Sequence, residues 1–490
     1  MRYKITVLPY NKIVYALRDE LLYDVLIKNG FKINAPCGGN GVCGKCRVVS
    51  VGKNGENMGY LYTCKTRVDS DITILLDGVG GSGLEVFESG DPIGEKSGLG
   101  IALDIGTTTV VACLVDLKSG SILGKRSCLN PQASLGADVI TRIRMCQNGK
   151  LDVLQKQILE TTKELVDLLA GKRRIRELCV CGNPTMLHLF LGVSPESIGI
   201  APFTPVFTQT KRLNGSELGL NVDNVVLLPS ASAFIGSDVT AGVLACGMVD
   251  KLSTSLLVDV GTNGEVVMFA NNVLYATSTA AGPALEGACI ECGMGGVDGA
   301  IDKVSAQNGE LIFSTVGNKP PKGICGSGLV DVVALLVKEG IIDESGAFDE
   351  DCESLLSKNL VSDRFYITDD VYLSQKDVRQ FQLAKSAITS GIKTLLYENN
   401  VPIEDVRALY LAGGLGYYTD VKNAGVVGLL PSDLVSKVQS VGNSGLSGTV
   451  KCLLKDECVK KVEQIASGIN VVELAQSKCF MEEFVDNMSF

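Results

Sequence analysis

Two segments of this 490-residue chain repeat one pattern about 155 residues apart, and this duplication constrains the fold more than any other feature. Each segment runs from an apolar strand through an Asp and a Gly-Thr turn into a second apolar strand: GIALDIGTTTVVACLVDL (100–117) and SLLVDVGTNGEVVMF (255–269). A third piece, ALYLAGGLGYY (408–418), reads as a buried strand ending in a Gly-Gly turn, and ELCVCGNPTML (177–187) offers its first-half counterpart. Together with helical spacing elsewhere, these strands predict an α/β body with an internal repeat.

The repeated turns carry groups that bind phosphate. Backbone N–H groups and hydroxyls of a Gly-Thr turn suit phosphate oxygens, and an Asp just before the turn reaches the shell of a Mg²⁺ ion. We therefore predict catalytic roles for Asp104 and Asp259. The predicted nucleotide-binding residues of these turns are Gly106, Thr107, Thr108, Thr109, Gly261, Thr262, Asn263 and Gly264. The alternative is a set of ordinary glycine-rich hairpins without a ligand.

In this order, the three motifs resemble those of the family of acetate and sugar kinases, Hsc70 chaperones and actin. The third matches the adenosine motif of that family, which implies that Gly413 and Gly414 also bind the nucleotide. The resemblance implies an actin/Hsc70-like ATPase of two lobes, 99–248 and 249–490, that close on ATP and Mg²⁺. It also implies that 236–247 forms a helix connecting the lobes. Family members take adenine contacts from the region before the third motif, here 374–388, and Lys385 is the candidate.

Residues 1–77 follow a different pattern. KITVLP (4–9) and KIVYAL (12–17) read as two strands, 18–30 has helical spacing, and DITILL (71–76) reads as a closing strand. A loop rich in glycine and cysteine lies between the helix and the closing strand. This order predicts a small α+β domain.

Four cysteines of this domain have the spacing C-x5-C-x2-C, with seventeen residues before the fourth, and the predicted ligands are Cys37, Cys43, Cys46 and Cys64. Interspersed glycines let the backbone approach the thiolates closely. The spacing resembles that of β-grasp 2Fe–2S ferredoxins, although plant-type loops have one residue fewer, C-x4-C-x2-C. It is nearer to the adrenodoxin-like branch. A zinc site is the alternative, but such sites usually contain two C-x2-C pairs.

Residues 78–98 are acidic and rich in glycine, and we predict a linker. As a flexible coil it would let the ferredoxin domain move relative to the ATPase. The alternative is an ordered strap held by Leu84, Val86 and Phe87.

Composition narrows the class of protein further. The net charge is −10, without a long run of Lys or Arg, so we expect no nucleic-acid partner. No stretch approaches eighteen uninterrupted apolar residues, and the first twelve residues lack the apolar centre of a signal peptide. The 17 cysteines are scattered rather than arranged as a dense disulfide framework. We therefore expect no membrane span and a reducing cytoplasm, such as that of an anaerobic cell.

A ferredoxin head fused to this kind of ATPase resembles the ATP-dependent reductive activators of corrinoid enzymes. The resemblance extends through 280–296, 321–336 and 441–448. It implies one-electron reduction of Co(II) to Co(I), a corrinoid protein of a methyltransferase system as partner, and an upstream low-potential electron donor. Longer members carry a further linker and middle domain. Because the first phosphate motif starts about 35 residues after Cys64, we expect that region to be absent, which leaves homodimer formation open.

Three other functions compete with this one. A radical-dehydratase activator also couples ATP to electron transfer, but such activators hold a 4Fe–4S cluster between two subunits and lack a ferredoxin head. A small-molecule kinase with a redox-sensing head would need a substrate pocket with a catalytic base, which is not recognisable here. The third alternative is an electron-carrying docking module whose ATPase half only binds nucleotide.

Several further residues have two interpretations each. Cys289, Cys292 and Cys325 either take part in a second cluster or are unengaged thiols, and the second interpretation is favoured because no fourth ligand is evident. The single histidine, His188, either meets the corrinoid or is a satisfied core residue, and the core is favoured. The remaining candidates are Asp238 and Glu286, which either position water or Mg²⁺ or cap helices, and Met186 and Met294, which we expect to be packing residues.

Overall fold

The computed structural model of the chain describes residues 2–8, 12–29, 31, 33, 46–51, 57–75 and 96–490. Cys37, Cys43 and nearly all of the linker 78–98 lie outside the described residues. The chain divides into two compact units, Met1–Ala245 with Asn443–Ser467, and Cys246–Gly442 with Gly468–Phe490. We call them unit 1 and unit 2.

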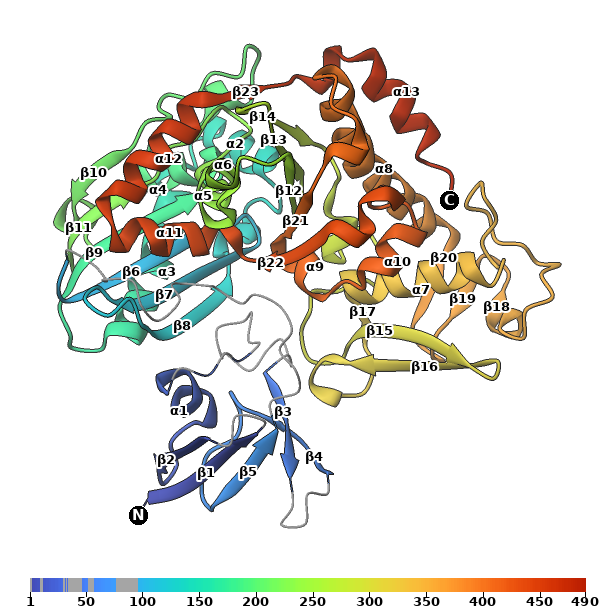
Figure 1. The fold of residues 1–490 in the computed structure, drawn as a ribbon, viewed down its shortest axis with the longest axis horizontal. Coiled ribbons are helices and arrows are strands. Elements are labelled where there is room, and N and C mark those ends of the chain that lie inside the picture. Colours follow the sequence, from blue (N-terminus) through green and yellow to red (C-terminus); the bar gives the residue numbers. More distant parts are fainter. Residues whose placement is uncertain are drawn as a thin grey trace. The chain divides into compact units, whose positions relative to one another are not determined.

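The N-terminal part of unit 1 is a five-stranded sheet with one helix (Figure 1). The strand order is β2-β1-β5-β3-β4, in which β1 and β5 run parallel and the other neighbours antiparallel. This mixed sheet agrees with the predicted β-grasp domain. Its elements are β1 (Arg2–Leu8), β2 (Lys12–Leu17), α1 (Leu22–Lys28), β3 (Arg47–Val51), β4 (Asn57–Tyr62) and β5 (Ile72–Leu75).

The body of unit 1 is built on a six-stranded sheet of order β10-β11-β9-β6-β7-β8. Its strands are β6 (Leu99–Ile105), β7 (Thr109–Asp116), β8 (Ile122–Leu129), β9 (Ile175–Gly182), β10 (Lys211–Asn214) and β11 (Val222–Leu227). Six consecutive residues of β7 are buried, as expected for a strand covered on both faces. The helices are α2 (Val139–Gln147), α3 (Leu151–Ala170), α4 (Pro184–Leu191), α5 (Ser237–Cys246), α11 (Ser444–Leu454) and α12 (Asp456–Gly468).

Unit 2 has a six-stranded sheet of order β22-β21-β12-β13-β14-β23 and two smaller three-stranded sheets (Figure 1). The strands of the large sheet are β12 (Ser255–Val260), β13 (Gly264–Ala270), β14 (Val273–Thr279), β21 (Ala408–Ala412), β22 (Val438–Gly442) and β23 (Ile469–Val471). The small sheets contain β15 (Ala300–Gln307), β16 (Glu310–Thr315), β17 (Gly323–Ile324), β18 (Leu360–Val361), β19 (Arg364–Tyr366) and β20 (Tyr372–Ser374). The helices are α6 (Met248–Lys251), α7 (Gly326–Lys338), α8 (Gln375–Glu398), α9 (Gly413–Tyr418), α10 (Val421–Val426) and α13 (Lys478–Asp486).

Five strands of each large sheet share one topology, β11-β9-β6-β7-β8 and β22-β21-β12-β13-β14, which confirms the predicted duplication. The sixth strand lies at opposite edges, β10 beside β11 and β23 beside β14. In each, a central strand pairs antiparallel with the next strand of the chain and parallel with the strand of the later motif. The register is also the same, because Asp104 lies opposite Cys181 in unit 1 and Asp259 lies opposite Ala412 in unit 2. The repeated Asp therefore occupies one structural position in both halves.

The predicted lobe boundaries did not include a return of the chain to unit 1. Residues Asn443–Ser467, which the predicted boundaries place in lobe II, belong to unit 1, where α11 packs on β6 and β9. Small residues allow close packing of α11, since a Cβ on Gly448 would lie 1.9 Å from the Ala241 carbonyl oxygen. Within the described part of the chain, no helix has the length and apolar character to cross a membrane.

Candidate nucleotide and cluster sites

The first phosphate loop, 106–109, joins β6 to β7 directly after Asp104. The Asp104 carboxylate accepts a hydrogen bond from Asn443 Nδ2 at 2.6 Å on Oδ2 and one from the Cys181 thiol at 3.6 Å on Oδ1. Burial raises the pKa of Asp104 above its usual range, although the hydrogen bond from Asn443 opposes the shift. Burial likewise raises the pKa of Cys181, so this thiol stays protonated and donates. The carboxylate of Asp104 is thus held in one orientation at the end of the strand.

Two asparagine side chains donate hydrogen bonds to the same loop. Asn130 Nδ2 donates to the Gly106 carbonyl at 2.9 Å, and Asn183 Nδ2 donates to Thr107 Oγ1 at 3.0 Å. Asn183 also caps α4, since its Oδ1 accepts from Met186 N at 3.0 Å. These contacts fix both the backbone and one hydroxyl of the predicted phosphate loop.

The second phosphate loop, 261–264, joins β12 to β13 directly after Asp259. Its backbone closes through Gly261 N and the Asn263 carbonyl at 2.9 Å. Here the hydroxyl of Thr262 donates to Glu286 Oε2 at 2.7 Å. The structure therefore places Glu286, one of the open candidates, beside the loop, where a carboxylate can position water or a metal.

The third motif brings a glycine against the second aspartate. Gly413 has φ +85°, and a Cβ there would lie 2.5 Å from the Val260 carbonyl and 2.8 Å from Asp259 Oδ1. Gly182 is its counterpart in unit 1, where a Cβ would lie 2.7 Å from the Ile105 carbonyl. The structure thus brings Asp259 and Gly413 together, and their roles toward a nucleotide stay predictions. Gly414 has open space around it, since a Cβ there would meet no described atom within 4 Å.

Lys385 lies in a different setting from the one expected of an adenine contact. Its side chain is 1% exposed within α8, and its Nζ donates to the carbonyl of Ser489. The ammonium lies 4.7 Å from the centre of the Phe490 ring. Burial lowers the pKa of Lys385 to about 8. Its amine is engaged by the C-terminal segment, so its role toward a nucleotide stays a prediction.

Of the four predicted cluster ligands, two lie in the described residues. The sulfurs of Cys46 and Cys64 are 2.9 Å apart, and Cys64 N donates to Cys46 Sγ at 3.4 Å. Both cysteines are buried, in a small cluster with Tyr23. Converging sulfurs that receive a backbone N–H, shielded from water, fit one side of an iron–sulfur cluster.

The remaining candidates behave largely as packing residues. His188 is fully buried; its Nε2 accepts from Val206 N at 3.1 Å, which leaves Nδ1 to donate to the Pro184 carbonyl at 2.7 Å. Burial lowers its pKa, and the ring stacks on Phe207. Met186 is fully buried. These contacts confirm the interpretation of His188 as a satisfied core residue.

Asp238 and three cysteines complete the set of open candidates. Asp238 lies in the first turn of α5, where its Oδ1 accepts from Val239 N at 2.9 Å. Cys289 is exposed, Cys292 is half-buried, and buried Cys325 donates to the Ile301 carbonyl at 3.3 Å. In the part of the chain that the structure describes, no group of three or more His, Cys, Asp or Glu side chains forms a metal site.

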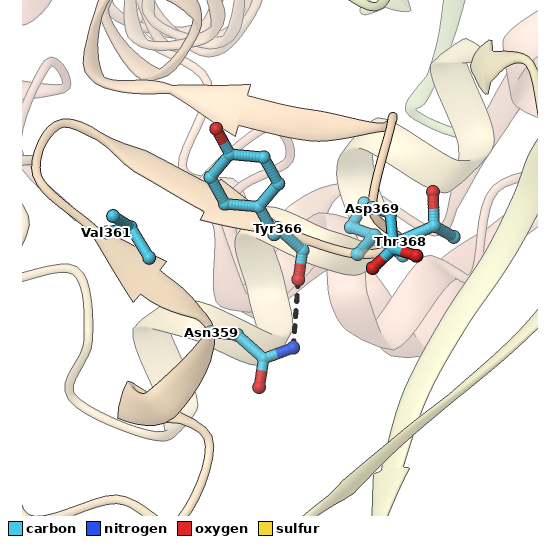
Figure 2. A pocket seen from close by; sticks show the side chains of 6 residues that line it. Asn359, Val361, Tyr366, Thr368 and Asp369 are labelled. Carbon is cyan, nitrogen blue, oxygen red and sulfur yellow. Dashed lines mark hydrogen bonds between the residues drawn. The ribbon is translucent and has the colours of Figure 1, made fainter.

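Unit 2 also has an open hollow of about 450 Å³ near the small sheet of β18, β19 and β20 (Figure 2). At its wall Asn359 Nδ2 donates to the Tyr366 carbonyl at 2.9 Å. The hollow is lined by Asn359, Val361, Tyr366, Ile367, Thr368 and Asp369. None of these residues belongs to the predicted phosphate or cluster sites.

The residues that support the predicted loop, and to which the sequence assigned no such role, are mostly asparagines. Asn130, Asn183 and Asn443 each precede a helix and accept from its first backbone N–H groups. An Asn before a helical pattern is a readable N-cap signal. Their second contacts, to the loop or to Asp104, depend on tertiary structure and have no local signal.

The repeated sheet, with a phosphate-type loop at the same place in each half, defines a duplicated ATPase fold of the ASKHA class. Family models agree: the C-terminal domain of RACo, the ASKHA domain, matches residues 253–490, and the RACo middle region matches residues 99–251. The chain is 36% identical over 424 residues to the corrinoid activation enzyme RamQ of Eubacterium limosum, covering 81% of this chain and 71% of RamQ. The chain belongs to the RACo family of corrinoid activators.

Two further relatives support this assignment. The chain is 25% identical over 440 residues to a Co(II) methylated amine-specific corrinoid protein reductase of Methanosarcina barkeri, covering 80% of this chain and 77% of that one. A solved reductive activator for a corrinoid, iron-sulfur protein matches 100% of this chain and 98% of its own, with 29% identity and a TM-score of 0.75. The expected absence of the middle region is wrong, because residues 99–251, predicted as lobe I, match that region.

Proposed function

We propose that this chain is an ATP-dependent reductive activator that delivers one electron to a corrinoid protein and converts Co(II) to Co(I). The observation that carries the proposal is the duplicated sheet with a phosphate-type loop after Asp104 and again after Asp259, in a chain of the RACo family. The reductase and activator names of its relatives favour this function over a radical-dehydratase activator or a small-molecule kinase.

Each of the two loops would contribute groups for nucleotide binding. Backbone N–H groups and hydroxyls of 106–109 and 261–264 would bind phosphate oxygens, while Asp104 and Asp259 orient Mg²⁺ and its water. Glu286, bonded to Thr262, would orient a water molecule for hydrolysis. The glycines of the third motif, Gly413 and Gly414, would let adenosine approach the backbone.

The N-terminal domain would hold a 2Fe–2S cluster on Cys37, Cys43, Cys46 and Cys64. The converging sulfurs of Cys46 and Cys64 support this ligand set. Such a cluster supplies one electron at about −400 mV in plant-type proteins. Co(II)/Co(I) corrinoid couples generally lie lower, and each 100 mV uphill costs about 2.3 kcal/mol for one electron. Nucleotide states that bind the partner with different affinity would supply this free energy.

The proposed partners follow from the function. They are a corrinoid protein of a methyltransferase system, an upstream low-potential electron donor, and a second copy of the chain in a homodimer. We place the protein in the cytoplasm, where its 17 cysteines would stay reduced.

The direct test mixes the reduced protein with a Co(II) corrinoid protein and follows the corrinoid absorbance with and without ATP. We expect Co(I) to form only with ATP. Equal yield without ATP, or none with it, contradicts the proposal.

Iron analysis tests the ligand set separately. We expect about two irons per chain in the wild type, loss of iron in Cys64→Ser, and unchanged iron in the matched control Cys289→Ser, because Cys289 is exposed and outside the ferredoxin domain. About four irons per chain would instead indicate a second cluster.

A further inference from the structure

An arginine lies buried directly beneath the first phosphate loop. Arg142, on α2, is 0% exposed. Its guanidinium donates to four uncharged acceptors: the Thr107 carbonyl at 2.6 Å, the Gly136 carbonyl at 2.8 Å, Met186 Sδ at 3.0 Å and Gln132 Oε1 at 3.1 Å. Burial lowers the pKa of Arg142 to about 10, so it keeps its positive charge at neutral pH.

No carboxylate among the described residues bonds to this cation. The acid whose charge opposes the lowering of its pKa is Asp138, which caps α2 and whose two oxygens accept from Thr141 N and Thr141 Oγ1, each at 2.8 Å. Burying a charge without a bonded counter-ion costs several kcal/mol, and replacing it with an apolar residue is often stabilising. Stability alone therefore does not explain an arginine here, and its positive charge remains available to an anion on the far side of the loop.

The loop above Arg142 is oriented to receive such an anion. Three successive carbonyls of the loop accept hydrogen bonds. The Gly106 carbonyl accepts from Asn130 Nδ2 at 2.9 Å, the Thr107 carbonyl from Arg142, and the Thr108 carbonyl from Asn130 N at 2.8 Å. In a trans peptide the N–H points opposite to the carbonyl. The N–H of Thr107, opposite the Gly106 carbonyl, consequently points away from Asn130 Nδ2, and the N–H of Thr108, opposite the Thr107 carbonyl, points away from Arg142. Successive N–H groups turned to one side form an anion-binding concavity.

We propose that Arg142 is a positioning residue that places a buried positive charge under the first phosphate loop. Its charge acts through the Thr107 peptide, so that unit 1 selects nucleotides by the negative charge of their phosphates. The inference rests on the proposed function only in assuming that this loop binds a nucleotide.

The test is nucleotide binding by the full chain, measured by titration calorimetry with ATP, ADP and adenosine without added Mg²⁺. Arg142→Gln is expected to weaken ATP at least about tenfold and adenosine less than about threefold, because the effect scales with ligand charge. Arg142→Lys keeps the charge and is expected to recover most of the ATP affinity. The matched control is Arg144→Gln, an exposed arginine on the same helix, which should bind like wild type.

A second variant separates charge from loop shape. Gln132→Glu places a carboxylate on Arg142 and leaves its bond to Thr107 in place, although it loses the 2.9 Å bond from Gln132 Nε2 to the Leu154 carbonyl. We expect weaker ATP binding with little change for adenosine, and thermal unfolding checks that the variant is folded. Wild-type ATP affinity in Gln132→Glu, or in Arg142→Gln, overturns the inference. A wild-type protein that binds no nucleotide instead overturns the proposed function.

Discussion

The two phosphate loops share a sequence signature and a position in their sheets, yet they are supported by opposite charges. The loop 106–109 has a buried arginine and two asparagines beneath it. The loop 261–264 has instead a carboxylate, Glu286, bonded to its threonine. A cation under a loop stabilises bound anions, while a carboxylate beside a loop repels them and can orient water or a metal. The duplicated scaffold therefore carries two loops of one signature that differ in the charge of the side chains bonded to them.

The largest expected effect is on the rate of ATP hydrolysis, and it tests whether both loops act in that reaction. Asp104→Ala and Asp259→Ala should each lower ATP hydrolysis about 100-fold or more, because each removes a carboxylate proposed to orient Mg²⁺. Phosphate release measures the rate. The matched controls are Asp167→Asn in unit 1 and Asp433→Asn in unit 2, both exposed and expected to hydrolyse ATP normally. A large loss in only one alanine variant would show that the repeated aspartates have different duties.

A variant of Glu286 tests whether this carboxylate acts in ATP turnover rather than in ATP binding. Glu286→Gln keeps an oxygen that accepts from Thr262 but removes the negative charge. We expect kcat for ATP hydrolysis to fall about tenfold or more, with the affinity for ATP not weakened, because the negative charge that repels phosphate is lost. Arg142→Gln should show the reverse, a weakened affinity. If Glu286→Gln weakens binding and keeps kcat, the division of roles between the loops is wrong.

The duplicated framework was predictable because it depends on local pattern. Apolar strands, Asp and Gly-Thr turns recur in order, and the observed register puts Asp104 and Asp259 at equivalent positions. The support of the loops was not predictable, because Arg142 and Asn443 lie 35 and 339 residues from their partners Thr107 and Asp104. Lys385 shows the same limit: the family resemblance singled it out, but only the packed C-terminal segment shows what its amine contacts.

The third prediction concerns stability and uses two neighbouring glycines. In Gly413→Ala the new Cβ would meet the Val260 carbonyl at 2.5 Å in a backbone with φ +85°, so we expect a loss of about 2 kcal/mol or more in the free energy of unfolding. Gly414→Ala meets nothing within 4 Å and should change it by less than about 0.5 kcal/mol. Denaturant unfolding compares them. Equal effects would mean that the close approach of Gly413 to the Asp259 strand is not required.

The smallest expected effect is a pH dependence of stability that distinguishes unit 1 from unit 2. His188 is the single histidine of the chain and lies on α4. The same helix is capped by Asn183, whose side chain also donates to Thr107 in loop 106–109. Because burial lowers its pKa below 6.5, the folded state disfavours protonation, so stability contributed by the neutral ring falls as pH drops below about 6.5. We expect the free energy of unfolding of unit 1 to decline by at most about 1.4 kcal/mol per pH unit there.

His188→Gln should flatten that decline between pH 7.5 and 5.5, while groups common to both proteins cancel in the difference. Hydrogen exchange followed by peptide mapping assigns the change to a unit. Acid-induced opening should appear first in the peptides of α4 and of loop 106–109, because the protonated ring can no longer accept from Val206 N. Loop 261–264 has no histidine behind it, since the chain contains only His188. Equal acid sensitivity of both loops would therefore contradict the idea that the residues supporting each loop respond to pH independently.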